Sequence, residues 1–444
     1  MKKPLALILA CAMISSLAAC SSGNASSGDN SASSNSSSSA ANNGKKVQIT
    51  ILGTLKDEVA TEFTQEMEEY NNSQDKYEIS SIPLDGTAMQ KLTTLYASGN
   101  APTIFTSGQE AATFKDKLLD LSTLEQIKQA QPGTTELMTD DSGKIFGMPI
   151  TVEAFGILYN KQILDEAVGG TFDPATINTQ DALKDLLAKI AATGVSADRI
   201  SGVDWSLGAH VTNLMYTTQS SALKDNLQFV SDLKDGKVDL SANKNFTGWL
   251  DTLDILLENN ASKNSPLAAT YDDDVLAFAE GKNGLWFQGN WATPMIKKAN
   301  ADIEIGIMPF PISNNASDYG NSQISVGASQ YFCVDASQAS QEQQDGAIDF
   351  LNWFFTSEVG QDYYVNKLSF IPAYKNITAT PADSLSQMIV DYMNDGNTLS
   401  WINMYYPGDG VTSFGASMQK YVSGNIDRAG LAKEIQDYWA NQKA

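Results

Sequence analysis

Histidine, cysteine and arginine are scarce in this chain of 444 residues. His210 is the only histidine, which excludes a histidine-rich zinc site, an HExxH motif and a conspicuous Ser-His pair. Of the three cysteines, Cys11 and Cys20 lie near the start and Cys333 lies alone in an apolar run, so no disulfide is expected within the main body. Cys333 is predicted to be a small core residue, and the fold must depend on packing.

Positive charge is scarce as well. The chain has 29 lysines and arginines against 52 aspartates and glutamates, and its formal net charge is −23. Phosphate backbones repel so acidic a surface, so nucleic acid is not expected as a partner. With only two arginines, Arg199 and Arg428, the chain also lacks the arginine cluster that a phosphorylated ligand would need.

Long hydrophobic runs are missing after the first residues. The apolar run 5–14 follows Lys2 and Lys3 and is too short to span a bilayer as a permanent helix. This pattern is typical of a secretory signal, so residues 1–19 are predicted to be a signal peptide.

The junction after this run carries a cysteine. Its residues, Leu17-Ala18-Ala19-Cys20, resemble the lipobox of bacterial lipoproteins, which implies that Cys20 becomes the lipidated, palmitate-bearing first residue of the mature chain. Ordinary secretion with an accidental cysteine is the alternative. Residues 20–44 are nearly all Ser, Asn, Ala and Gly, a composition that buries too little apolar surface to fold and predicts a flexible tether.

The remaining chain of about 400 residues exceeds what one core usually organises, so two lobes are expected. Strands are predicted at 47–52, 77–82 and 101–106, and the helical spacing of apolar residues predicts helices at 57–70 and 88–98. Further helices are predicted at 179–192, 221–233, 246–258, 271–280, 341–355, 359–366, 414–422 and 427–439, with a strand-rich stretch at 284–334. This alternation favours an α/β fold with helices flanking a parallel or mixed sheet.

Three stretches, 141–161, 277–291 and 347–361, together with Phe370-Ile371-Pro372, resemble the extracellular solute-binding proteins of ABC importers. The resemblance is to the carbohydrate branch, which includes maltose-binding protein. It implies a two-lobed periplasmic-binding-protein-like fold with a hinge and an inter-lobe cleft. The first lobe would comprise 45–154 plus 303–355, and the second 155–302 plus 356–444.

The resemblance also implies a function. The chain is expected to be a lipid-anchored receptor on the extracellular face of the cell membrane, which captures an oligosaccharide and delivers it to the permease subunits of an ABC transporter. It would be a monomer without enzymatic activity, cofactor or metal, and would touch the membrane through its anchor only. The alternatives are a binding protein for a peptide or polyamine, and a lipid-anchored glycoside hydrolase with a pair of carboxylates.

A sugar ring presents an apolar face and a rim of hydroxyls, so its site needs flat aromatic rings and planar hydrogen-bonding groups. By resemblance, Trp291 would stack on a sugar ring and Asn290 would bond its hydroxyls; a core tryptophan at a helix start is the alternative. Glu153 matches a cleft carboxylate of the maltose-binding branch and lies in an apolar setting, where a charge needs a partner. The alternative is a hinge carboxylate paired with a lysine or a backbone amide.

Four further positions complete the predicted site. Gln109 falls where maltose binders have an acidic sugar ligand. Trp401 and Tyr405 lie in a segment rich in Gly and Pro, and aromatic residues in a loop are costly to expose. Trp205 is predicted to contact the ligand as well, and packing inside the lobe is the alternative. The acidic run 272–274 begins a predicted helix and is interpreted as helix capping, not as a cation site.

Overall fold

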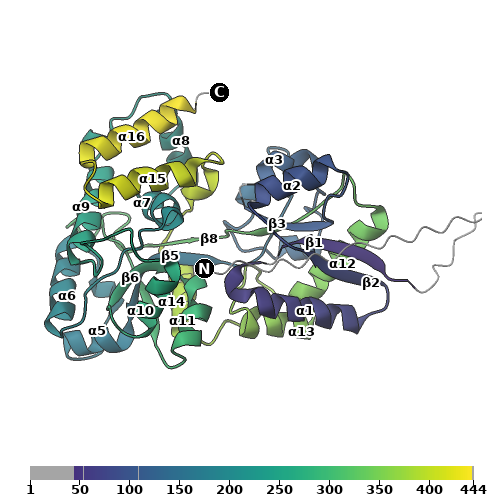
Figure 1. Cartoon of the computed structure of the whole chain (residues 1–444), viewed down its shortest axis with the longest axis horizontal. Coiled ribbons are helices and arrows are strands. Elements are labelled where there is room, and N and C mark those ends of the chain that lie inside the picture. The colour runs from purple at the N-terminus through teal and green to yellow at the C-terminus, as the bar shows by residue number, and fades with distance from the viewer. Residues whose placement is uncertain (1–44, 54, 109, 443–444) are drawn as a thin grey trace, which may run out of the picture. The chain divides into compact units, whose positions relative to one another are not determined.

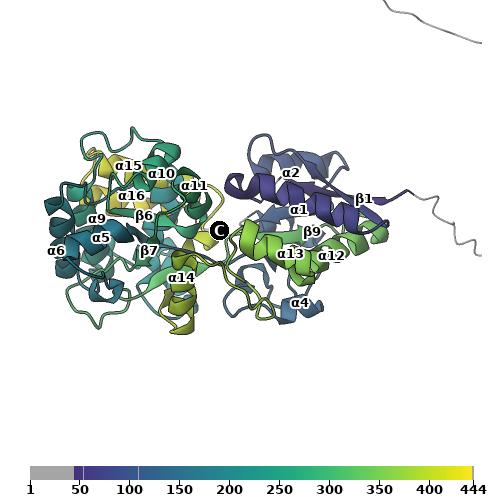
Figure 2. The same ribbon diagram turned by 90° about the horizontal axis from the view of Figure 1, so that it is seen from below.

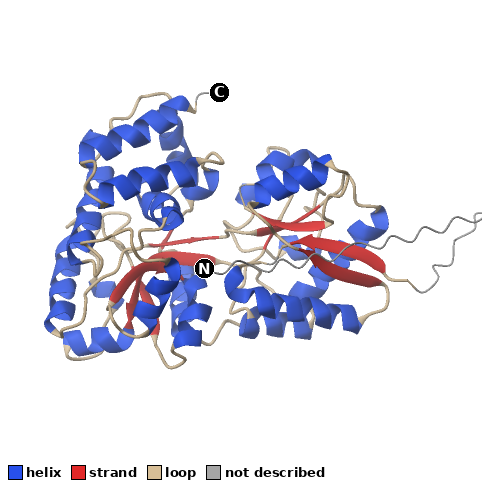
Figure 3. Cartoon of the chain, viewed as in Figure 1, coloured by secondary structure: helices blue, strands red, loops and turns tan. Residues whose placement is uncertain are grey.

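The computed structural model describes residues 45–53, 55–108 and 110–442. The predicted signal peptide, the lipidation site Cys20 and the tether lie outside the described residues. Two separate sheets organise the described part of the chain, as the prediction of an α/β fold with two lobes requires (Figures 1 and 3). We call the parts built on these sheets the first and the second lobe.

The first sheet has the strand order β2-β1-β3-β9-β4. Its strands are β1 (Val47–Leu52), β2 (Tyr77–Ile82), β3 (Ile104–Ser107), β4 (Met148–Pro149) and β9 (Tyr331–Val334). β1 pairs in parallel with β2 and β3, while β9 runs antiparallel to β3 and β4. Figure 1 shows α2 (Ala88–Ala97) and α3 (Ala111–Phe114) on one side of this sheet, and α1 (Ala60–Ser73) and α13 (Glu358–Asp362) on the other. The predicted strand and helix pairs at the start of the lobe are confirmed.

The second sheet has the strand order β10-β8-β5-β6, and β7 also pairs with β5. Its strands are β5 (Glu153–Asn160), β6 (Leu285–Gly289), β7 (Ile305–Met308), β8 (Ile324–Gly327) and β10 (Thr398–Leu399). All eight residues of β5 are buried, because it has neighbours on both edges and helices on both faces. β10 runs parallel to β8, whereas β6, β7 and β8 run antiparallel to β5.

Seven further helices lie close to their predicted ranges: α6 (Gln180–Ala192), α8 (Leu223–Lys234), α9 (Lys244–Asn259), α10 (Tyr271–Ala279), α12 (Gln341–Thr356), α15 (Gly410–Val422) and α16 (Arg428–Asn441). The sequence patterns did not predict α4 (Glu125–Lys128), α5 (Lys161–Val168), α7 (Thr212–Thr217), α11 (Thr293–Ala299) and α14 (Ser384–Asn394). The predicted helix 359–366 is instead divided between α13 and a π-helical segment, Tyr363–Lys367. A second π-helical segment, Ser206–Val211, precedes α7. Every residue of α7 is buried, so it lacks the one-sided pattern by which sequence reasoning finds a helix.

Strand pairing corrects the predicted lobe boundaries. The sequence predicts 303–355 for the first lobe, but β7 and β8 both pair with β5 in the second sheet, so the chain re-enters the first sheet only at β9. The sequence also predicts the second lobe from residue 356 onward, but α13 packs on α12, and the segment after it contacts α1. Figure 2 shows α12 and α13 side by side in the first lobe, while α14 lies in the second. Short apolar strands carry no local signal for which sheet they join.

Three segments connect the two sheets. The first runs from β4 to β5, the second from β8 to β9, and the third follows Ile371, which forms an isolated antiparallel bridge with Val152 in the first segment. Tyr364 fixes the same region, since its hydroxyl donates to the carbonyl oxygen of Ile150 at 2.7 Å. The first two crossings place Glu153 and Gly327 directly beside each other.

The acidic run at the start of α10 caps that helix, as predicted. The Thr270 side chain accepts from the Asp273 amide, and the Asp273 carboxylate accepts from the Thr270 amide, which forms a capping box. Asp274 is only 1% exposed and pairs with Arg199. Among the described residues, no group of three or more His, Cys, Asp or Glu side chains is placed to hold a metal ion. In the same part of the chain, no helix is both long and apolar enough to cross a membrane.

The two arginines offer a matched test of the buried ion pair. Arg199→Ala should lower the free energy of unfolding by about 3 kcal/mol, because Asp274 would remain as a buried charge without its partner. Arg428→Ala should cost about 1 kcal/mol or less, since Arg428 is 41% exposed and its partners Asp251 and Asp254 are accessible to water. Denaturant unfolding of both variants provides the comparison. Equal losses would contradict the assignment of Arg199 as the structural arginine.

Candidate ligand-binding site

Strand pairing in the second sheet brings the candidate residues to one edge. Glu153 begins β5 and pairs with Gly327, the last residue of β8, while Phe155 pairs with Gly289, the last residue of β6. Because β10 runs parallel to β8, the segment after Leu399 leaves the sheet at the same edge. The residues that follow three different strands therefore meet the start of β5, although they are far apart in the sequence.

Two glycines make room for two indole rings at this edge. A Cβ atom on Gly289 would overlap ring carbons of Trp291, and a Cβ atom on Gly327 would lie 2.8 Å from Cγ of Trp401. Each indole thus lies directly over the backbone at the end of a strand. The two ring centroids are 6.5 Å apart and the ring planes are nearly perpendicular, at 87°.

His210 joins these indoles into a larger group of rings. Its ring centroid lies 4.6 Å from Trp291, 4.8 Å from Phe155, 5.5 Å from Trp205 and 6.4 Å from Trp401. We call these five residues the aromatic cluster. Alternation along β5 places Phe155 and Glu153 on the same face of the sheet, so the predicted carboxylate faces the same side as the rings.

The remaining tryptophans of the second lobe differ from those of the cluster. Trp249, Trp286 and Trp439 are fully buried, and their indole nitrogens donate to Val211 O at 2.9 Å, Ser201 Oγ at 3.0 Å and Tyr216 Oη at 2.8 Å. Trp401 is 6% exposed, but its Nε1 is buried without a hydrogen-bond partner. Trp205 and Trp291 are partly exposed. Trp249, Trp286 and Trp439 are therefore core residues whose indole N–H groups are hydrogen-bonded. The tryptophans of the cluster, in contrast, have exposed ring surface or an N–H group without a partner.

Glu153 is paired with a lysine from the first lobe. Its carboxylate forms an ion pair with Lys56 and accepts a hydrogen bond from the Ser329 hydroxyl. Lys56 Nζ also lies 5.4 Å from the centroid of the Trp291 ring, within the range of a cation–π interaction. The alternative of a lysine-paired hinge carboxylate is thus what the structure contains, and a ligand role for Glu153 remains a prediction.

Asn290 has a structural task as well. Its side-chain oxygen accepts a hydrogen bond from the Ala154 amide at 2.9 Å, and the residue is 8% exposed. This bond joins the segment after β6 to β5 and fixes the backbone position from which the Trp291 side chain extends. The amide nitrogen of Asn290 and the second lone pair of its oxygen are then left for a ligand.

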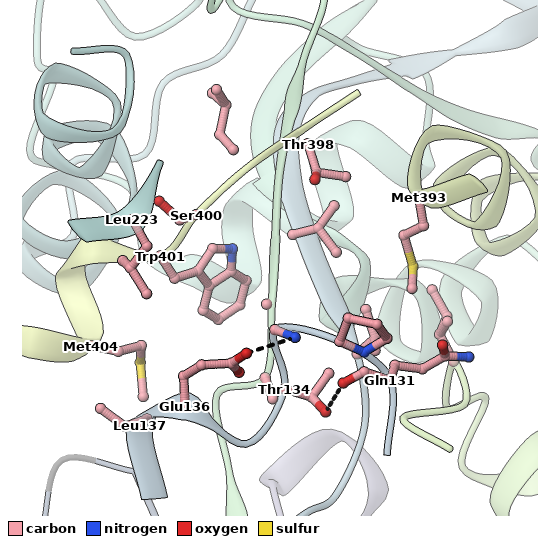
Figure 4. A pocket seen from close by; sticks show the side chains of 18 of the residues that line it. Gln131, Thr134, Glu136, Leu137, Leu223, Met393, Thr398, Ser400, Trp401 and Met404 are labelled. Atoms are coloured by element: carbon pink, nitrogen blue, oxygen red, sulfur yellow. Dashed lines mark hydrogen bonds between the residues drawn. The ribbon is translucent and has the colours of Figure 1, made fainter. Parts of the chain in front are cut away.

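Two cavities adjoin the predicted residues. A small one, about 20 Å³, is lined by Lys56, Glu153, Asn290 and Trp291 among others. A larger one, about 510 Å³, is lined by Trp401, Met404 and Tyr405 together with residues of the first lobe. Figure 4 shows the Trp401 indole and the Met393 side chain on opposite sides of this larger cavity, with Glu136 along its border.

The larger cavity belongs mainly to the other face of the crossing strands. It is lined by Val152 and Val326, which alternate to the face opposite Glu153, and Gly327 borders it as well. Tyr405 lies there, apart from the ring contacts of the cluster, and desolvation raises the pKa of its hydroxyl, as does the charge of Glu136. The predicted residues therefore do not line a single cavity. Trp401 lines the larger cavity and also contacts the aromatic cluster, whereas Tyr405 lines the larger cavity without contacting the cluster.

Gln109 lies outside the described residues, so its predicted role is not tested. The residue before it in the same loop packs closely against other segments, because a Cβ atom on Gly108 would lie 2.8 Å from the carbonyl oxygen of Ser329 and 3.0 Å from Met404 Cε. Glu110 stabilises this loop by accepting a hydrogen bond from the Gly108 amide at 3.1 Å.

Sequence reasoning missed Lys56, His210, Ser329 and the two glycines under the indoles. Lys56 follows the end of β1, and loops at the carboxyl ends of parallel strands are common ligand sites, so its position offered a weak signal. His210 and Ser329 offered none, because only strand pairing and helix packing bring them to Trp291 and Glu153.

The support beneath Trp291 can be tested by adding a single methyl group. Gly289→Ala should displace the indole and lower the free energy of unfolding by about 1–3 kcal/mol, because the added Cβ overlaps the ring. The near-ultraviolet circular dichroism of the aromatic cluster should change with it. Gly170→Ala is the control, since a Cβ atom there meets nothing within 4 Å. An unchanged spectrum in Gly289→Ala would contradict the described position of Trp291.

Comparison with known proteins gives relatives of one kind. Residues 58–388 match the family model of bacterial extracellular solute-binding proteins. A multiple sugar-binding protein of Streptococcus mutans is 27% identical over 223 residues, which are 50% of this chain and 50% of that protein. The chain thus aligns with about half the length of this curated relative.

Solved structures show the same fold. The solute-binding protein RafE in complex with raffinose has a TM-score of 0.73 at 20% identity, over 90% of this chain and 100% of that one. A sugar transporter from Bacillus licheniformis in complex with stachyose has a TM-score of 0.69 at 18% identity, over 89% and 100%. Because the family match covers most of the described chain, this protein belongs to the bacterial extracellular solute-binding proteins, which are binding proteins and not enzymes.

Proposed function

We propose that this chain is the substrate-binding component of an ABC transporter and that it captures an oligosaccharide at the aromatic cluster. The observation that carries the proposal is the pair of indoles, Trp291 and Trp401, on the same edge of the sheet as a carboxylate. Flat rings cover the apolar faces of sugar units, and charged groups bind the hydroxyl rim. Glu153 and Lys56 supply both an acceptor and donors for hydroxyl groups.

The relatives support the same ligand class. One is named a multiple sugar-binding protein, and two similar structures hold raffinose and stachyose. A third similar structure is a chitin oligosaccharide binding protein, with a TM-score of 0.70 at 18% identity. These ligands are all oligosaccharides, which makes a peptide or polyamine the weaker candidate for this chain.

We infer that ligand binding restrains the movement of the two lobes relative to each other. Lys56 belongs to the first lobe, Trp291 to the second, and Glu153 to the segment that crosses between them. A ligand that binds all three would restrain the lobes through the crossing strands, and a permease could detect that restrained state. The transporter subunits and the monomeric state remain part of this proposal.

The stacking role of Trp291 predicts a loss of affinity on truncation. Trp291→Ala should weaken oligosaccharide binding by roughly 30-fold, which corresponds to about 2 kcal/mol of lost contact with the apolar sugar face. Titration calorimetry of the body from residue 45 onward, against di- to pentasaccharides including raffinose and stachyose, measures this change. Trp353→Ala is the control, because Trp353 lies on α12 of the first lobe. Unaltered affinity in Trp291→Ala would remove the site assignment.

The anchor at Cys20 is also part of the proposal. In a bacterial host, the full-length chain should collect in the membrane fraction, and Cys20→Ala should move it to the soluble fraction, because only the acyl chains would hold it at the membrane. Fractionation followed by immunoblotting measures the distribution, with Cys11→Ala as the matched control. The same distribution for both variants would refute the anchor and leave the sugar-binding proposal intact.

A further inference from the structure

His210 occupies the centre of the proposed site. It lies in the π-helical segment Ser206–Val211, an irregular form of helix that is often found at functional sites. Its ring contacts Trp291, Phe155 and Trp205 at centroid distances of 4.6 to 5.5 Å. The side chain is partly exposed, so one part of the ring reaches the surface of the cluster.

The imidazole has polar atoms that the packing does not use. Its Nδ1 is buried and has no hydrogen-bond partner. Within the described part of the chain, Nε2 has no hydrogen-bond partner either, but it is not among the buried unpaired atoms, so it forms the accessible polar edge. A phenylalanine would make the same ring contacts without leaving a buried nitrogen unpaired, a defect that lowers stability. Packing alone therefore does not explain a histidine at this position.

The environment selects one form of the ring. A buried acceptor without a partner is tolerated more easily than a buried N–H group without one, so the proton belongs on Nε2 and the lone pair on Nδ1. Burial lowers the pKa of His210 to about 3, and the positive charge of Lys56 acts in the same direction. The ring is thus neutral at any physiological pH, with its single N–H at the accessible edge.

We propose that His210 is a specificity-determining residue, whose neutral Nε2–H donates a hydrogen bond to an oxygen of the ligand stacked against Trp291. The inference rests on the proposed function and adds a chemical requirement to it. The ligand must carry an acceptor oxygen beside its stacked face, as a hydroxyl, a ring oxygen or a glycosidic oxygen does. A polyamine has only protonated amines, which offer no acceptor, so this donor selects against it.

Two substitutions separate the hydrogen bond from the packing. His210→Phe keeps a flat ring in the cluster and removes the donor, whereas His210→Gln keeps an N–H donor and removes the ring. We expect the phenylalanine variant to melt at or above the wild-type temperature and to bind raffinose or stachyose about tenfold more weakly, as the loss of one hydrogen bond implies. The glutamine variant should recover part of that loss. If His210 only supported the fold, the phenylalanine variant would bind these saccharides as tightly as the wild type.

Because His210 is the only histidine, its ring nitrogens can be observed without assignment. Tag-free protein labelled with nitrogen-15 should show a neutral imidazole protonated at Nε2, in a spectrum that correlates ring protons with ring nitrogens. The Nε2 signal should shift when raffinose or stachyose is added, while Nδ1 remains unprotonated. This measurement also decides the matter should the phenylalanine variant fail to fold.

The outcomes separate this inference from the function on which it rests. If the wild type binds a saccharide of the panel and His210→Phe binds it equally well, the inference is wrong and the proposed function stands. The inference would also be wrong if the proton were on Nδ1, or if the Nε2 signal did not shift when a saccharide binds. If the wild type binds no member of a panel of di- to pentasaccharides, the proposed function fails and the inference fails with it.

Discussion

The antiparallel pairing of β5 with β6 and β8 is the constraint on which the site depends. Glu153 is at once the first residue of β5, the partner of the last residue of β8 and part of the segment that leaves the first sheet. Shifting this register by one residue would turn Glu153 and Phe155 to the opposite face and separate them from His210 and Trp291. The full burial of β5 makes such a shift costly, so the core of the second lobe fixes the geometry of its surface.

Much of the fold could be predicted because its signals are local. The strands at 47–52 and 77–82 show β-branched alternation, and the structure has them at the same residues. The helix predicted at 179–192 is present as α6, with the Thr179 side chain as its N-cap. Lobe membership could not be predicted for β7 and β8, because each has only four residues, all apolar or small, that would suit either sheet.

The candidate site was predictable only where a motif carried it. Trp291 and Glu153 were found through their resemblance to a family pattern, and the structure places them within reach of a common partner, Lys56. The sequence did not identify Lys56 and His210 as site residues, because a charge near a strand end and a lone histidine carry no signal until their neighbours are known. Asn290 and Tyr405 show the converse: a polar or aromatic residue in a suggestive segment can serve mainly to join strands or to border a neighbouring cavity.

The position of Lys56 over Trp291 has an energetic consequence for capture. Under the proposed function, a sugar that stacks on the face of the indole near Lys56 would displace the ammonium group, so binding there would exchange one attractive contact for another. The displaced interaction is worth about 0.5–1 kcal/mol at a partly exposed site, and the net affinity is smaller than the sugar contacts alone would give. For a carrier that releases its ligand, such an internal competitor would shorten the lifetime of the loaded state, since the lysine would return to the ring as the sugar departs.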